Sequence, residues 1–165
     1  MRETSEHTGA VHPLRLLMRL PVPWVFVLAF LVGVGLQFLV SIHIGSSGAV
    51  LLMKIAGGVL FVVGASVAAW GLFIFHRAGT TTVPGEPSLR LVTEGPYRFS
   101  RNPMYVGLVL AYLGEVGLLT QIWPLFLLPF TVAYVNWVVI PVEEATLKGF
   151  QDRYEQYCAR VRRWV

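Results

Sequence analysis

Long apolar runs dominate this 165-residue chain, and polar residues gather between them. The runs cover residues 22–42, 49–75, 103–119 and 124–142. A helix that spans a bilayer needs ~20 apolar residues, with a range of ~17–25. Because apolar residues fill each run rather than one helical face, the pattern predicts an all-α, polytopic membrane protein with about four transmembrane helices.

The connections between these runs set the expected topology. The first two runs predict two spanning helices within residues 22–75. Only residues 120–123 separate the third run from the fourth, so residues 103–142 are predicted to form a tight antiparallel helical hairpin. We expect no cleaved signal peptide, because the first run begins too late and is too long for one.

Three segments outside the runs carry most of the polar residues. Residues 1–21 mix leucines with arginines, which predicts an amphipathic helix lying on the bilayer surface. Residues 76–102 combine turn residues with apolar ones, which indicates an ordered, packed loop. Residues 143–165 repeat apolar side chains at spacings of three and four, which predicts an amphipathic tail helix. We treat residues 1–165 as a single membrane-embedded domain.

The composition supports a membrane location, and the basic residues predict its orientation. The chain is 55% hydrophobic and 13% charged, with a mean hydropathy of +0.64, well outside the range of soluble domains. Twelve of the 13 Lys and Arg residues lie outside the runs, on what would be one side of the membrane; the exception is Lys54. Since basic residues favour the cytoplasmic side, we expect both termini and the central loop there. No basic–aromatic pattern indicates nucleic acid, so the net charge of +4 is better explained by topology and anionic lipid.

The cysteine and the histidines do not indicate a metal centre. Cys158 is the single cysteine, so no intramolecular disulfide is possible, and a helix-face position suits it better than a catalytic role. The four histidines show no metal-ligand spacing, and we expect no metal.

The segment from Gly95 to Gly107 brings two arginines to the start of the third run. Arg98 and Arg101 are three apart, and guanidinium groups bind carboxylate or phosphate bidentately. Pro103 suits the first turn of a helix, whose free N–H groups also favour an anion. The arginines are therefore either an anion-binding site or basic anchors on lipid phosphates.

Acidic residues form a second cluster where the fourth run ends. Adjacent carboxylates such as Glu143 and Glu144 repel each other and need a positive partner. They either begin the tail helix, where the macrodipole favours acids, or bind a cationic ligand group. Glu115 is the one acid within a predicted span; we expect it near the outer head groups, with Lys54 as a candidate partner.

Together these motifs resemble the isoprenylcysteine carboxyl methyltransferase and phospholipid methyltransferase superfamily of integral membrane enzymes. The matching residues lie, in the family's order, within about the last ninety residues: Gly79, Thr80, Gly95, Pro96, Tyr97, Arg98, Arg101, Asn102, Pro103, Met104, Tyr105, Gly107, Glu143, Glu144, Leu147, Phe150, Tyr154 and Tyr157. Asn102 stands where many carboxyl methyltransferases have His, and Asn occurs there in phospholipid N-methyltransferases and many bacterial relatives. This departure weakens an assignment to prenylcysteine substrates.

The resemblance implies methyl transfer from S-adenosylmethionine to a lipophilic substrate, such as an isoprenylcysteine carboxylate or a phospholipid amine, at the cytoplasmic membrane face. Glu143 or Glu144 would bind the cofactor's ammonium or sulfonium end and accept a proton from an amine substrate. Arg98 would orient a substrate carboxylate or phosphate. The implied cofactor pocket also includes Gly79, Thr80, Tyr97, Arg101, Asn102, Pro103, Met104, Tyr105, Gly107 and Tyr154.

Two other functions stay open at this point. Some sterol reductases resemble the superfamily in their C-terminal half and bind a nicotinamide cofactor there, although they are generally much longer. A non-catalytic membrane adaptor with the same fold is the other alternative, and the presence of both arginines and both glutamates argues against it.

Overall fold

The computed structural model describes residues 21–42, 46–79 and 90–165, except for the side chain of Lys148, so the helix expected over residues 1–21 lies almost wholly outside it. All regular elements in these ranges are helical, which confirms the all-α class. The α-helices are α2 (Val22–Leu39), α3 (Ser47–Arg77), α4 (Pro103–Leu119), α5 (Trp123–Tyr134), α6 (Ile140–Leu147) and α7 (Asp152–Arg160). Shorter helical turns are η1 (Gly95–Arg98), the π-helical η2 (Val135–Val139) and η3 (Lys148–Phe150).

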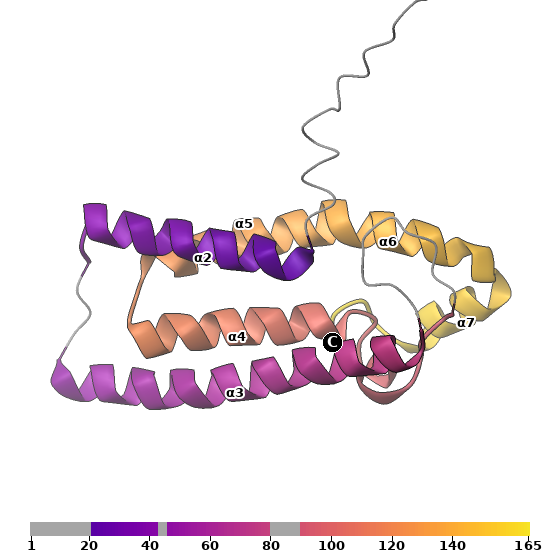
Figure 1. Ribbon diagram of the computed structural model, residues 1–165, viewed down its shortest axis with the longest axis horizontal. Coiled ribbons are helices and arrows are strands. Elements are labelled where there is room, and N and C mark those ends of the chain that lie inside the picture. The colour runs from indigo at the N-terminus through magenta and orange to yellow at the C-terminus, as the bar shows by residue number, and fades with distance from the viewer. Residues whose placement is uncertain (1–20, 43–45, 80–89) are drawn as a thin grey trace, which may run out of the picture.

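The long helices form two side-by-side pairs. α4 packs along α3, and α5 packs along α2 (Figure 1). Successive helices run in opposite directions, so α3 ends and α4 begins at the end of the molecule where α7 lies (Figure 1). We call this end the α7 end. The tight hairpin expected over residues 103–142 is not confirmed, because α4 and α5 are antiparallel but each packs mainly against an earlier helix.

Glycines bring α3 and α4 into backbone contact. Gly57, Gly64 and Gly71 are buried and lie seven residues apart on α3. A Cβ on Gly57 would come within 2.6 Å of the Leu118 N atom, and one on Gly107 within 2.5 Å of the Ala68 N atom. Small residues allow such close approach of two helices in a membrane, where packing rather than water drives their association.

The contact between the α3 glycines and α4 predicts that alanine substitutions at two neighbouring positions differ sharply in their effect on stability. Gly57→Ala should destabilise the protein by about 1–3 kcal/mol, because its methyl group would overlap main-chain atoms of α4 that cannot move aside. Gly58→Ala is the matched control, since its methyl group would meet only Leu118 Cδ2, at 3.5 Å. Thermal unfolding in detergent measures both. Equal shifts in Tm for the two variants would contradict the observed helix contact.

Tyr112 on α4 joins the two helix pairs. Its ring meets Phe30 of α2 edge to face, with centroids 5.3 Å apart, and its hydroxyl donates to the Pro124 carbonyl of α5 at 2.8 Å. Gly33 of α2 lies directly against Pro124. A Cβ placed on Gly33 would be 2.8 Å from the Pro124 Cγ. One buried aromatic side chain of α4 therefore contacts both α2 and α5.

The last long helix extends further than we expected. Helical structure continues from Trp123 to Leu147, whereas the sequence predicted that the span would end at residue 142. Pro141 has no N–H to donate and its ring crowds the carbonyl four residues earlier. The π-helical turn η2, which ends at Val139, gives the wider helix geometry that accommodates such a defect.

The tail is not the single helix predicted over residues 143–165. Its first residues complete α6, η3 follows, and α7 ends at Arg160. Residues 161–165 contain no helix and turn back toward the helix bundle (Figure 1). We call residues 161–165 the C-terminal strap. The tail prediction was therefore wrong in extent and correct for α7 alone.

Within the described part of the chain, three helices are long and apolar enough to cross a membrane: α2, α3 and the helix from Trp123 to Leu147. Their outward side chains are large and apolar, as an integral membrane protein requires; Leu52, for example, is 68% exposed. α4 is shorter, at 17 residues, so a fourth span remains a prediction. Among the described residues, Glu115 and Lys54 form no ion pair within 4.0 Å.

Candidate functional site at the α7 end

The arginine segment and the two glutamates meet at the α7 end of the molecule. Arg101 and Glu143 are 42 residues apart in the sequence. Arg101 Nη1 lies 3.3 Å from Glu144 Oε1. The Tyr105 hydroxyl, one helical turn further along, donates to Glu143 Oε1 at 2.5 Å. The structure thus brings together residues that the sequence could only propose as neighbours.

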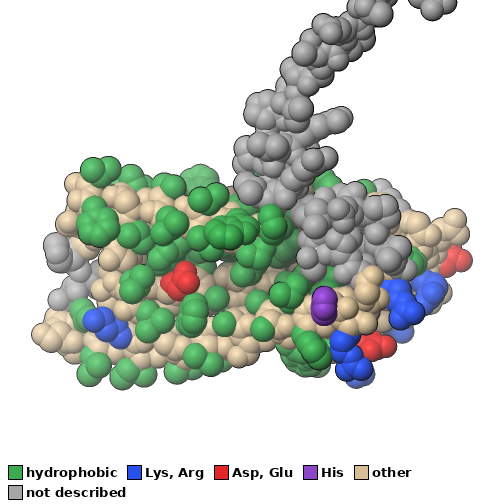
Figure 2. All heavy atoms as spheres, viewed as in Figure 1, with side chains coloured by type: hydrophobic (Ala, Val, Ile, Leu, Met, Phe, Trp, Pro, Cys, Tyr) green, Lys and Arg blue, Asp and Glu red, His purple; other side chains and the backbone are tan. Residues whose placement is uncertain are grey.

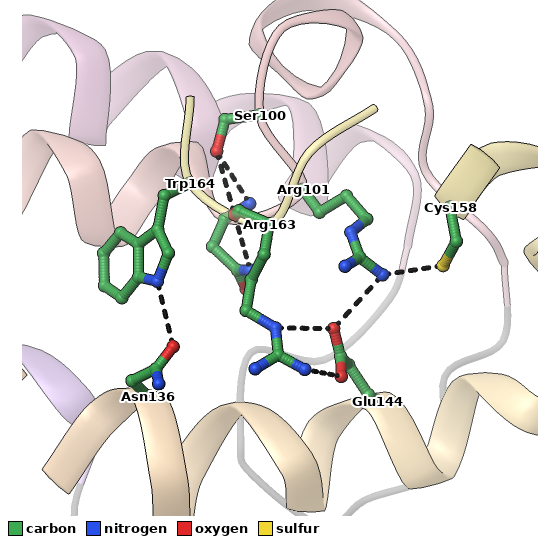
Figure 3. A network of polar contacts seen from close by, with 8 residues as sticks. Ser100, Arg101, Asn136, Glu144, Cys158, Arg163 and Trp164 are labelled. Atoms are coloured by element: carbon green, nitrogen blue, oxygen red, sulfur yellow. Dashed lines mark hydrogen bonds and ion pairs between the residues drawn. The ribbon is translucent and has the colours of Figure 1, made fainter. Parts of the chain in front are cut away.

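Glu144 has two guanidinium partners. Arg163 of the C-terminal strap donates from Nη2 to Oε2 at 2.6 Å and from Nε to Oε1 at 3.3 Å, which is a bidentate pair. Arg101 contacts the same carboxylate (Figure 3). The carboxylate lies near the C-terminal end of α6, where the helix macrodipole disfavours an acid, so the two arginines offset that unfavourable position.

Glu143 has a different environment from its neighbour. Its carboxylate accepts the Tyr105 hydroxyl, and among the side chains that the structure describes, which do not include that of Lys148, no Lys or Arg lies within 4.0 Å of it. A neutral phenol cannot balance a carboxylate charge, and an ionised carboxylate away from water calls for a positive partner. Of the two acids, Glu143 is therefore the one able to receive a cationic ligand group.

Arg101 also has unused donor capacity. Its Nη1 contacts Glu144 and the Cys158 sulfur of α7, whereas its Nε is buried and has no partner among the described residues. Guanidinium N–H groups that lie away from water are normally hydrogen bonded. A buried N–H of this kind is suited to an acceptor oxygen of a ligand.

The C-terminal strap closes over the start of α4. The Arg101 N–H donates to the Arg162 carbonyl at 2.9 Å, and the Asn102 side-chain N–H donates to the Arg163 carbonyl at 3.0 Å. The Trp164 indole then donates to Asn136 Oδ1 of the π-helical turn at 3.0 Å (Figure 3). Asn102 therefore holds the strap in place, and Arg163 and Trp164 are site residues that the sequence reasoning missed.

Tyr97 is buried in the packing between η1, α3 and α7. It is buried, with 3% of its surface exposed, and its carbonyl accepts the Tyr157 hydroxyl of α7 at 2.7 Å. Its ring packs beside Phe75 of α3, with centroids 5.1 Å apart. Tyr97 thereby joins η1 to both α3 and α7, which fixes the loop that carries Arg101.

The tyrosines around the loop and α7 remain protonated. Burial is the largest cause that raises the pKa of Tyr97, Tyr154 and Tyr157 above the ordinary value of 10.0. For Tyr154 the hydrogen bond with Cys158 and the charge of Glu144 raise the pKa further. These phenols can donate hydrogen bonds near neutral pH but cannot accept a substrate proton, which leaves the carboxylates as candidate bases.

Several residues expected in the pocket lie in helix packing instead. Gly107 meets the backbone of α3, and Met104 lies against Gly71, with its Cγ 2.7 Å from a Cβ placed there. Pro103 is buried at the first turn of α4. These three residues position the start of α4, and so the arginine segment, rather than contribute polar groups.

Of four other expected residues, three stand apart from the glutamates or lie outside the described ranges, and the fourth, Tyr154, lies near Glu144. Gly79 lies two residues after the end of α3, with φ +65°, and is exposed, and Thr80 lies outside the described residues. Arg98 lines a separate open pocket with residues of α7. Tyr154 lies on α7 close enough to Glu144 for that charge to affect its pKa.

Fold and site together define an α-helical integral membrane protein with a paired acid and arginine cluster at one end of its helices. The sequence model of the phospholipid methyltransferase family matches residues 52–153, which is more than half of the chain and includes both clusters. The chain belongs to this family and is a membrane methyltransferase. Comparisons with curated proteins and with solved structures gave no match.

Proposed function

We propose that this protein transfers a methyl group from S-adenosylmethionine to a lipophilic substrate at the membrane surface. The proposal rests on two side chains: Glu143, a carboxylate without a cationic partner among the described side chains, and Arg101, a guanidinium whose buried Nε has no partner among them. Both groups lie within the region that matches the methyltransferase family.

These two groups suit the amino-acid end of S-adenosylmethionine. That end is a zwitterion, with an ammonium group that needs a carboxylate and a carboxylate that needs N–H donors. Glu143 would bind the ammonium, and Arg101 Nε would donate to the carboxylate. Such charge-assisted hydrogen bonds are about twice as strong as neutral ones, and two of opposite sign fix the orientation of the ligand.

Glu144 has a positioning role in this account. Its carboxylate is already neutralised by Arg101 and Arg163, so it would not be the ammonium ligand. It keeps the Arg101 side chain in place and links the C-terminal strap to α6. The cofactor contact that the sequence left open between the two acids is thus assigned to Glu143.

The residues of this chain would act by alignment and by exclusion of water. S-adenosylmethionine supplies an electrophilic methyl group, and displacement at that group is favoured by correct orientation more than by a strong catalyst. The C-terminal strap and α7 would cover the site, and Tyr105 would orient the Glu143 carboxylate through its 2.5 Å hydrogen bond. An amine substrate also has to lose a proton, for which the carboxylates are the nearest acceptors.

We favour a phospholipid amine or a similar lipophilic molecule as the substrate. Asn102 occupies the position of the His found in many carboxyl methyltransferases, and its amide N–H is used by the strap. A lipid would approach laterally from the bilayer to the α7 end. Lys and Arg side chains gather at that end (Figure 2), which favours its placement on the cytoplasmic side.

Methyl transfer into lipid tests the proposed activity. The purified full-length chain, incubated with methyl-labelled S-adenosylmethionine and native membrane lipids, should label the lipid fraction. Separate arms with amine-headgroup phospholipids and with a prenylated cysteine distinguish the substrate classes, and we expect label in the first. Lipid fractions without label above a heat-treated control would contradict the proposal.

A further inference from the structure

A polar pocket lined by three arginines lies at the α7 end, and neither Glu143 nor Glu144 lines it. Arg98 comes from η1, and Arg153 and Arg160 come from α7. The pocket is open to the surface and has a volume of about 430 Å³, and Thr93, Gln156 and Tyr157 also line it. It lies on a different face of α7 from Cys158, which contacts Arg101.

We infer that this pocket binds a phosphate group, supplied by the head group of an anionic lipid or by a soluble phosphate. Three guanidinium groups that converge on one pocket repel one another unless an anion lies between them. Guanidinium forks match phosphate oxygens bidentately, and a hydroxyl and an amide beside them provide further donors.

The arginines that line the pocket have donors left for such a ligand. Within the described residues, both ion pairs involve Glu144, and no carboxylate lies within 4.0 Å of Arg98, Arg153 or Arg160. Arg160 uses its Nε to donate to the Gln156 carbonyl of its own helix at 3.1 Å. Its terminal nitrogens form no hydrogen bond with the described residues.

The position of the pocket places it at the level of lipid head groups. α3 ends at Arg77 and α4 begins at Pro103, so the apolar helices end where the pocket begins. Phe99, next to Arg98, is 73% exposed, as is typical of an aromatic side chain that inserts into a membrane interface. Lys and Arg side chains gather at this end of the molecule (Figure 2), and basic residues near an anionic membrane surface are attracted to its phosphates.

A bound phosphate would connect two elements that the cofactor site depends on. η1 ends three residues before Arg101, and α7 carries Cys158 and leads into the C-terminal strap. Bridging Arg98 to Arg153 and Arg160 would therefore hold α7 against the loop. Glu143 does not line this pocket, so the pocket would bind phosphate whether or not the chain transfers methyl groups.

Lipid binding to the full-length protein in detergent tests the inference. The probe is short-chain phosphatidylglycerol, with its affinity measured by native mass spectrometry and by the rise in Tm. We expect Arg98→Gln, Arg153→Gln and Arg160→Gln each to weaken binding roughly tenfold, the loss expected when one hydrogen bond to a charged group is removed. The three side chains lie at an open pocket, and the Tm without lipid checks that each variant is folded.

The control and the second probe make the result specific. Arg162→Gln removes the same charge from an exposed side chain that does not line the pocket, and it should leave the affinity unchanged. Tighter binding of the lipid than of inorganic phosphate would identify the head group as the source, and the reverse order would identify free phosphate. Equal affinity in all variants, or an equal loss in Arg162→Gln, would overturn the inference.

Discussion

Glu144→Gln is expected to lower the free energy of unfolding by about 2–3 kcal/mol, somewhat less than the ~3–5 kcal/mol for breaking a fully buried ion pair. The variant leaves Arg101 and Arg163 without their shared carboxylate, and the side chains of Arg101 and Glu144 are only 18% and 19% exposed. Arg163 is more exposed, at 34%, so water replaces part of what it loses. The loss also frees the C-terminal strap from α6.

Thermal and denaturant unfolding in detergent measure this loss of stability. Glu155→Gln is the matched control, because Glu155 is an exposed acid on α7 and belongs to neither ion pair. It should change the stability by less than about 0.5 kcal/mol, as exposed substitutions usually do. A Glu144→Gln protein as stable as the Glu155→Gln protein would show that the two arginines do not depend on Glu144.

Glu143→Gln is expected to reduce cofactor affinity and to leave the stability nearly unchanged. It should weaken S-adenosylmethionine binding roughly tenfold or more, because a hydrogen bond to a charged group contributes about 1.5–3 kcal/mol and ~1.4 kcal/mol is a factor of ten. Its stability should stay close to that of the natural chain, since the amide oxygen of Gln still accepts the Tyr105 hydroxyl. Isothermal titration calorimetry and thermal unfolding measure the two effects.

The contrast between the two adjacent acids is the informative outcome. Glu144→Gln should mainly reduce stability, whereas Glu143→Gln should mainly reduce cofactor affinity. If Glu143→Gln were as destabilising as Glu144→Gln with unchanged affinity, Glu143 would be a structural residue and the assigned ammonium site would be wrong.

The sequence predicted the helices well, because an apolar run of spanning length admits few other structures. The third run was expected over residues 103–119 and α4 covers Pro103–Leu119. The pairing of the helices was not predicted, because the short connection between α4 and α5 suggested that they would pack together. The sequence did contain a signal for the pairing of α3 with α4: Gly57, Gly64 and Gly71 recur every seven residues and allow the two helices to touch.

The sequence predicted the charged residues of the candidate site but not the C-terminal strap that covers it. Opposite charges near one membrane boundary had to find partners, and Arg101 and Glu144 did so. The C-terminal strap could not be predicted, because its contacts with Arg101 and Asn102 use main-chain carbonyls, which have no sequence pattern. Val161 and Trp164 fit a helical spacing of three, and this spacing led to the prediction of a longer tail helix.

The measurement that tests the central claim most directly is calorimetric binding of S-adenosylmethionine to the purified full-length chain in detergent. We predict saturable binding at one site, which is weakened by Glu143→Gln, unaffected by Glu155→Gln and not competed by NADPH. An absence of binding, or binding that Glu143→Gln leaves unchanged, would contradict a cofactor site built on Glu143 and Arg101.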